Sequence, residues 1–370
     1  MLLEGSSLGP FTKTGRYFSD VEDRPVSEDS PLACRLWYTL GPASIDVQNA
    51  MLAEGAGGVR LTFSFGTTAL QFELAMGTKE CAMRTGREFL VMADIAGEKF
   101  RLGKFTGGAT AVSVAAGQQV EFVLASTCRP GKDRTVLAVP FPEYFAKLRR
   151  DATVVVGDGA AELRVTAVSD QKAFAEVSEG GVIEHTRGLT IRASAFCPKS
   201  LTEKDLADLQ HVLSSEVYDM VALSFVSSAV DVQTVRQMAK RAGRDYLTIA
   251  AKIETPMGLE SLDEICDAAD VIIAARGDLA LALPWVELPG AVERIAKAAL
   301  AAGKAWILAT QIVEGLERFG YPTCAETCDL ARWLQAGCSG VLLSRETAFG
   351  SKPALAVSAV ARMIARWSMR

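Results

Sequence analysis

The sequence of 370 residues is 49 % hydrophobic, which is enough for two domains or for one large barrel with an insertion. Its net charge is −5 and its lysines and arginines are scattered, which argues against a nucleic-acid or membrane-surface partner. Eight cysteines without a Cys-x-x-Cys pair, beside only two histidines, indicate reduced thiols and argue against a zinc site.

The first 34 residues are polar and irregular in pattern, and we expect an N-terminal extension with one short helix there. This segment lacks the basic start and apolar core of a signal peptide. No stretch of the sequence reaches the roughly 18 uninterrupted apolar residues that a membrane-spanning helix needs. We therefore expect a cytoplasmic protein with no membrane partner.

From residue 35 onward, apolar strand-like runs alternate with helical patterns. Eight strands are predicted, at residues 35–40, 58–63, 89–95, 220–225, 247–253, 271–275, 305–310 and 340–344. Helical periodicity follows most of them, as at residues 46–54, 229–242, 257–269, 286–302, 325–335 and 353–367. Eight strand–helix units predict an α/β fold, a (β/α)8 TIM barrel over residues 35–103 and 198–370, with its site at the C-terminal strand ends.

Residues 104–197 break this alternation. The segment is rich in Gly, Val and Thr, and it has short strand-like runs at residues 110–114, 119–123, 152–156 and 189–192, separated by turn signals such as Pro130-Gly131. It predicts a small inserted all-β domain after the third barrel strand. An insertion there overhangs the mouth of the barrel, so we interpret it as a lid, with a decorative domain as the alternative.

Two strand ends carry the clearest functional signal. One apolar run ends in Lys252-Ile-Glu254 and the next ends in Arg276-Gly-Asp278. Residues i and i+2 of a strand point to the same side, so each strand would present a cation and a carboxylate together. Two carboxylates suit a divalent metal, and the cations suit an anionic substrate. Structural ion pairs are the alternative reading for a single strand, but two such strands favour an active site.

Other predicted strands also end in polar residues. These are Arg60 on the second strand and Ser64 just after it, Asp94 on the third, Ser224 on the fourth, and Thr310 and Ser344 on the last two. Solubility alone does not explain polar side chains at this end of seven strands, so we expect them to line one site.

Several short motifs make the sequence resemble the pyruvate kinase family. In the family's order and with its spacings they are residues 39–44 (TLGPAS), 59–66 (VRLTFSFG), 93–101 (ADIAGEKFR), 201–205 (LTEKD), 251–254 (AKIE), 275–279 (ARGDL), 309–311 (ATQ), 322–326 (PTCAE) and 343–350 (LSRETAFG). The resemblance covers about residues 35–370 and is weakest in the inserted segment. It implies a phosphotransferase acting on phosphoenolpyruvate and ADP.

The resemblance implies roles for individual residues. Glu254 and Asp278 would hold Mg2+, or Mn2+, against the carboxylate and phosphate oxygens of the substrate. Lys252 would neutralise the transferring phosphoryl group and the developing enolate, and Arg60 would contact the phosphate. Phosphoryl transfer depends on positioned cations more than on covalent help, which fits this set.

The remaining substrate contacts follow the same resemblance. Backbone amides near Gly277 would bind the substrate carboxylate, and Thr310 would belong to the proton relay that ketonises enolpyruvate. Arg101 is kept at a position that the family uses near the nucleotide. With the strand-end serines Ser224 and Ser344, Gly277 and Arg101 make up the expected substrate-binding set.

The monovalent-cation site departs from the family pattern. The family usually binds this ion with an Asn, a Ser, an Asp and a Thr; here Thr62 replaces the Asn and Ile95 the Thr, while Ser64 and Asp94 remain. Lys99 stands where the family has a Glu, which resembles the potassium-independent branch, in which an ammonium substitutes for the ion. We therefore expect that Ser64, Asp94 and Lys99 form the cofactor position and that K+ is not required. A solvated Lys99 at a strand end is the alternative.

Other departures lie where the nucleotide of the family binds. Phe65 replaces a His, Glu98 a Pro and Phe349 a Lys. A carboxylate at Glu98 would repel phosphates unless a cation compensates it. The phosphoryl acceptor, ADP or another molecule, is therefore left open.

The family carries a further α/β domain after the last barrel helix, and it binds effectors and builds the tetramer. The present sequence ends at Arg370, so we expect a short, divergent member without that allosteric domain. Homo-oligomers would then form through the barrel.

Three functions fit the sequence. The first is phosphoryl transfer between phosphoenolpyruvate and ADP or another acceptor. The second is a Mg2+-dependent lyase, aldolase or decarboxylase that forms the pyruvate enolate from a 2-oxo acid. The third is a non-catalytic sensor, which the pairing of Lys252 with two carboxylates disfavours because buried charges are costly to keep without a ligand.

Overall fold

The computed structural model describes residues 35–86, 88–129, 131, 135–192 and 198–368. The expected N-terminal extension lies outside these residues. Among the described helices, none is both long and apolar enough to cross a membrane.

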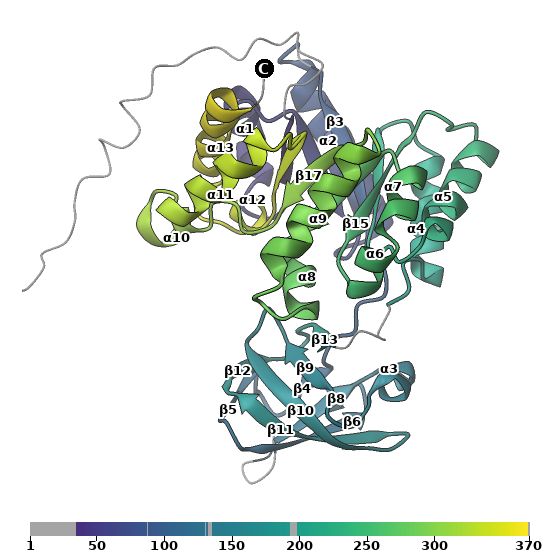
Figure 1. Cartoon of the computed structure of the whole chain (residues 1–370), viewed down its shortest axis with the longest axis vertical. Helices are drawn as coiled ribbons and strands as arrows, with labels where there is room; N and C mark the ends of the chain where they lie inside the picture. The colour runs from purple at the N-terminus through teal and green to yellow at the C-terminus, as the bar shows by residue number, and fades with distance from the viewer. Residues whose placement is uncertain (1–34, 87, 130, 132–134, 193–197, 369–370) are drawn as a thin grey trace, which may run out of the picture.

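Eight parallel strands close into a barrel (Figure 1), so the predicted fold class is confirmed. Around the barrel the order is β1-β18-β17-β16-β15-β14-β3-β2. The strands are β1 (Arg35–Thr39), β2 (Gly58–Thr62), β3 (Leu90–Ile95), β14 (Met220–Leu223), β15 (Thr248–Ile253), β16 (Val271–Ala275), β17 (Ala305–Ala309) and β18 (Gly340–Leu343). Every residue of β14, β16 and β18 is buried, as expected for strands that are covered on both faces.

Helices cover the outside of the barrel. They are α1 (Gln48–Ala53), α2 (Thr68–Met83), α4 (Glu203–Leu213), α5 (Ala229–Arg241), α6 (Pro256–Glu260), α7 (Leu262–Ala268), α8 (Arg276–Ala282), α9 (Leu288–Ala301), α10 (Gly315–Phe319), α11 (Cys324–Gln335), α12 (Arg345–Ala348) and α13 (Pro353–Trp367), with a 3-10 turn η1 (Ile45–Val47). The single helix predicted at 257–269 is in fact two, α6 and α7, which meet at Ser261.

The barrel interior is filled by apolar side chains, with Trp37 as the largest. The ring of Trp37 lies against Gly58: a Cβ atom at Gly58 would come within 2.4 Å of it. Met92, Ile273 and Ile307 belong to the same buried cluster. Because the interior is packed, polar side chains can gather only at the barrel end, as in other barrels of this type.

The inserted segment forms its own β layers with a separate core. Its six-stranded sheet has the order β13-β9-β10-β11-β6-β8, and two strand pairs, β12 with β5 and β4 with β7, accompany it. The bounds are β4 (Lys104–Phe105), β5 (Ala111–Val114), β6 (Gln119–Leu124), β7 (Thr127–Cys128), β8 (Thr135–Val139), β9 (Thr153–Val156), β10 (Ala161–Val168), β11 (Lys172–Glu179), β12 (Gly181–Glu184) and β13 (Leu189–Arg192), with one helix α3 (Pro142–Lys147).

This β module lies at one end of the barrel, next to α8 (Figure 1). Arg192 at the end of β13 donates to the carbonyl of Leu281 in α8 at 3.2 Å, and it forms a two-pronged ion pair with Glu162 at 2.6 and 3.0 Å. Helix α8 directly follows strand β16, so the module stands at the C-terminal end of the barrel strands. This is the end at which the sequence predicts the site.

Candidate active site

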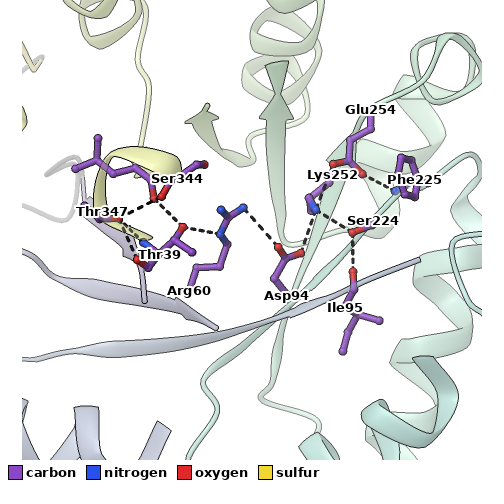
Figure 2. A network of polar contacts seen from close by, with 11 residues as sticks. Thr39, Arg60, Asp94, Ile95, Ser224, Phe225, Lys252, Glu254, Ser344 and Thr347 are labelled. Atoms are coloured by element: carbon purple, nitrogen blue, oxygen red, sulfur yellow. Dashed lines mark hydrogen bonds and ion pairs between the residues drawn. The ribbon is translucent and has the colours of Figure 1, made fainter. Parts of the chain in front are cut away.

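Lys252, in strand β15, is the centre of a buried polar network at the mouth of the barrel (Figure 2). Its Nζ lies 3.1 Å from Oδ1 of Asp94 and 3.2 Å from Oε1 of Glu254. It also donates to Oγ of Ser224 at 2.8 Å, and that hydroxyl donates to the carbonyl of Ile95 at 2.6 Å. Three neighbouring strands therefore fix the ammonium in one place.

Two opposed influences set the protonation of Lys252. Burial alone lowers the pKa of the ammonium, but the carboxylates of Asp94, Glu254 and Asp278 outweigh burial and raise the pKa above its usual value. The side chain therefore stays a cation at neutral pH. A fixed buried cation is suited to stabilising negative charge that develops on a substrate.

Arg60 supplies a second cation on β2. Its Nε donates to Oγ1 of Thr39 at 2.8 Å, and its Nη1 lies 3.5 Å from Oδ2 of Asp94 (Figure 2). Thr39 in turn donates to the carbonyl of Leu343 at 2.8 Å. The long contact to Asp94 leaves the guanidinium only partly neutralised, so it can bind an anion.

Glu254 follows the last residue of β15 and is 2 % exposed. Its Oε2 accepts the backbone N–H of Phe225 at 2.7 Å, a residue with a left-handed φ of +52°. Burial raises the pKa of Glu254 and Asp278 raises it further, while Lys252 and the Phe225 N–H lower it; the net direction is upward. A buried carboxylate with a raised pKa gains stability when a cation binds beside it.

The second strand end differs from the prediction that Arg276 and Asp278 point to the same side. Strand β16 ends at Ala275, and Arg276 and Asp278 lie in the first turn of α8, where i and i+2 do not share a face. Arg276 accordingly points to Thr310 and Asp329, at 2.7 and 2.5 Å, and not to Asp278. The strand-parity argument is right for Lys252 and Glu254 and wrong for this pair.

The cation beside Asp278 is Lys99, whose Nζ lies 2.7 Å from Oδ1. Burial raises the pKa of Asp278, but Lys99, and then Lys252 and Arg101, bring it below its usual value. Lys99 is therefore paired with a carboxylate, while about a third of its side chain stays exposed (33 %). It is held against a candidate metal ligand.

A cavity of about 30 Å³ lies between the barrel and the β module. Its lining includes Lys99, Glu254 and Asp278. This volume exceeds the roughly 10–15 Å³ that one water needs. In the described part of the chain no three His, Cys, Asp or Glu side chains gather as a metal cage. Mg2+ is commonly bound by one or two carboxylates and completed by water and substrate oxygens, so the Glu254 and Asp278 donors suit it.

The other predicted residues lie at different distances from this network. Thr310 follows β17 and approaches Gly277, where an added Cβ would come within 3.0 Å of its Cγ2. Oγ of Ser344 is buried without a hydrogen-bond partner in the described structure, which makes it an unsatisfied polar atom at the end of β18. Ser64 lies in the exposed turn after β2 and is not part of the network around Lys252.

Arg101 and Phe65 form a pair at the rim. The guanidinium of Arg101 lies 5.9 Å from the centroid of the Phe65 ring, which is 57 % exposed. Arg101 also donates to the carbonyl of Thr186 in the β module at 3.4 Å. An exposed aromatic face with a cation beside it is a surface on which a nucleobase or another flat group could stack.

Glu98 has a partner that the sequence did not reveal. Its Oε2 lies 2.8 Å from Nζ of Lys147, at the end of α3, and accepts the N–H of Lys199 at 3.0 Å. Lys147 therefore supplies the cation that is needed to offset the repulsion between Glu98 and a bound phosphate.

Comparison with known proteins gives the family. The model of the pyruvate kinase barrel domain matches residues 33–357. The chain belongs to the pyruvate kinase family. The pyruvate kinase of Mycobacterium tuberculosis strain H37Rv is 34 % identical over 332 residues, which cover 88 % of this chain and 68 % of that protein. That of Chlamydia trachomatis serovar D is 32 % identical over 328 residues, covering 88 % and 66 %. Family membership makes the chain a phosphotransferase, in agreement with the resemblance drawn from its motifs.

Sequence reasoning missed four residues that support the site. Thr39 and Phe225 hold Arg60 and Glu254, while Lys147 and Asp329 hold Glu98 and Arg276. Thr39 begins one of the quoted motifs and could have been found from it. The other three act through contacts between distant segments, for which the sequence holds no local signal.

Proposed function

We propose that this chain catalyses Mg2+-dependent phosphoryl transfer between phosphoenolpyruvate and a nucleoside diphosphate such as ADP, through the enolate of pyruvate. The observation that carries the proposal is the Lys252 ammonium, buried between Asp94 and Glu254 beside the cavity that Glu254 and Asp278 line. The names of the two relatives described above, both pyruvate kinases, give the substrates by analogy.

Glu254 and Asp278 would hold the metal, Mg2+ or Mn2+, which would supply charge neutralisation for the carboxylate and phosphate oxygens of the substrate. The Lys252 ammonium, held by three partners, would stabilise the negative charge of the transferring phosphoryl group and of the enolate oxygen. Arg60, only partly neutralised by Asp94, offers its guanidinium to the phosphate.

Thr310 would carry the proton to C3 of the enolate, as the family resemblance implies. Its position beside Gly277 brings it to the same turn as Asp278. The buried and unpartnered Oγ of Ser344 would serve the same end of the site by binding the substrate or a water. The backbone at Gly277 lies in the first turn of α8, where N–H groups are free to bind a carboxylate.

Lys99 replaces the monovalent cation in this proposal. We expect the wild-type rate to be the same in K+ and in a buffer with only tetramethylammonium. Lys99→Met removes the charge 2.7 Å from Asp278 and should lower kcat at least about 100-fold, a typical loss for one preorganised electrostatic group. Steady-state rates in the two buffers check this, with Lys99→Arg as the charge-conserving control. A wild-type enzyme that requires K+ would show that Lys99 has another role.

The direct test is a phosphoenolpyruvate assay with the purified full chain, Mg2+ and a panel of ADP, GDP, UDP and inosine diphosphate, with pyruvate and the nucleoside triphosphate both quantified. We expect one triphosphate for each pyruvate formed. If no phosphoenolpyruvate is consumed with any acceptor, the proposed function is wrong. The ion pair between Lys147 and Glu98 weakens one of the arguments for a nucleotide-free lyase, while the replacements at Phe65 and Phe349 remain.

A further inference from the structure

Arg276 makes an unusual set of contacts for a residue that faces away from the metal ligands. It begins α8, and its side chain is 12 % exposed. Its Nη2 and Nε donate to the carbonyl of Thr310 at 2.7 and 3.1 Å, and Nη2 also donates to the carbonyl of Gln311 at 2.9 Å. One guanidinium therefore holds two consecutive peptide groups of the turn after β17.

Those two peptide groups belong to a strained turn. Thr310 and Gln311 have φ values of +74° and +54°. The left-handed region is disfavoured for residues with a Cβ, and a β-branched residue there is an outlier. Such a conformation persists only where the surroundings impose it, and it is concentrated at functional sites.

Asp329 of α11 completes this set of contacts. We call Arg276, Asp329 and the carbonyl groups of Thr310 and Gln311 the clamp. Its Oδ2 lies 2.5 Å from Nη1 of Arg276, and its Oδ1 accepts the indole N–H of Trp333 at 2.8 Å. Trp333 is buried and packs edge-on against Trp306 of β17, with ring centroids 5.8 Å apart. The carboxylate that orients Arg276 is thus itself fixed, through Trp333, to strand β17, which Thr310 directly follows.

The clamp also explains where the Thr310 side chain lies. With its carbonyl turned toward Arg276, Cγ2 of Thr310 sits against Gly277, so close that a Cβ there would be 3.0 Å away. The next residue, Asp278, is one of the two candidate metal ligands. The turns after β16 and β17 are therefore locked together through Arg276 and Gly277.

We infer that Arg276 and Asp329 are positioning residues that hold Thr310 at the reacting centre in its strained conformation. This inference rests on the proposed function, because it uses Thr310 as the group that delivers the proton to the enolate. Neither Arg276 nor Asp329 would touch the substrate; both would act through the backbone of Thr310. A displacement of about 1 Å at a reacting group can lower a rate about 100-fold.

The test is a double-mutant cycle between Arg276→Lys and Thr310→Ala. Lysine keeps the charge but cannot span two carbonyls and a carboxylate with a planar fork. We expect Arg276→Lys to lower pyruvate formation about 100-fold, and to slow deuterium exchange at C3 of pyruvate by the same factor. In the Thr310→Ala background Arg276→Lys should cause no further loss, since residues that act through one another are not additive. Fully multiplicative losses would overturn the inference.

Hydrogen–deuterium exchange gives a readout that needs no catalysis. The N–H groups of Ile312 and Val313 donate to Oε1 of Glu346, at 2.8 and 3.3 Å, and report on the turn after β17. We expect faster exchange of a peptide covering residues 310–313 in Arg276→Lys and in Asp329→Asn. Unchanged exchange in both variants would refute the clamp.

The matched control is Arg236→Lys, which changes a partly exposed arginine of α5 that pairs with Asp270 at 2.8 Å. It should leave both the rate and the exchange unchanged. If the wild-type chain shows no phosphoryl transfer at all, the proposed function fails, while the exchange experiment still decides whether Arg276 and Asp329 hold the turn.

Discussion

Replacing Lys252 with methionine is expected to lower kcat for phosphoryl transfer by about 10³-fold, the upper range for losing one preorganised electrostatic group. The same change should destabilise the fold by about 3–5 kcal/mol, because it leaves buried carboxylates without their cation. Asp94 and Glu254 are 4 % and 2 % exposed, and the nearest other cation, Arg60, is 3.5 Å from Asp94. Urea denaturation and steady-state kinetics measure the two effects separately.

Lys252→Arg is the control that separates charge from position. It keeps a cation between Asp94 and Glu254, so its loss of stability should be limited to about 1–3 kcal/mol from the bulkier side chain. Its activity should still fall, since a planar guanidinium cannot place a point charge where the ammonium lies. A Lys252→Met variant that keeps more than about a tenth of the wild-type kcat would contradict the role of Lys252 in the transition state.

The barrel was predictable because its signal is local and repeated. Each apolar run that ends in a polar residue is a strand whose two faces are buried, and β14, β16 and β18 have this burial throughout. Helix α2 was harder to recognise because three of its apolar residues, Leu70, Met76 and Met83, face solvent and blur the helical period.

The site was predictable only where the backbone geometry followed from the pattern. Lys252 and Glu254 meet at 3.2 Å, as two residues at a strand end should. Arg276 and Asp278 have the same spacing in the sequence, but the chain turns into α8 at Arg276, and a helical turn separates their side chains. The true partners, Asp329 and Lys99, come from segments 53 and 179 residues away, and no local rule names them.

Some sequence predictions are not tested by the fold or by the relatives. The cytoplasmic location, homo-oligomers formed through the barrel and independence from K+ stay predictions. The chain spans about two thirds of the length of the pyruvate kinases it resembles, 68 % for the M. tuberculosis protein. Whether an effector changes the activity of this chain is a question for rate measurements on the purified 370-residue protein.

Removing either candidate metal ligand is the second change with a large expected effect. We expect Glu254→Gln and Asp278→Asn each to raise the Mg2+ concentration for half-maximal activity at least about 100-fold, because even the loss of a group that supports a ligand costs about 10–100-fold in affinity. Mg2+ titrations of the phosphotransferase rate, and Mn2+ binding followed by electron paramagnetic resonance, measure this. Glu293→Gln, which neutralises an exposed carboxylate on α9, is the matched control and should not change either result.

Glu254→Gln and Asp278→Asn should differ in how much they destabilise the metal-free protein. Glu254 is buried with a raised pKa, so Gln removes a carboxylate that is costly to keep charged, although it also removes a partner of Lys252. Asp278 has a lowered pKa and pairs with Lys99, so Asn leaves that ammonium without its partner. We therefore expect Asp278→Asn to destabilise the metal-free protein more than Glu254→Gln does. If both variants bind Mn2+ as tightly as the wild type, the two carboxylates do not hold the metal, and the roles of Lys252 and Arg60 would need a different explanation.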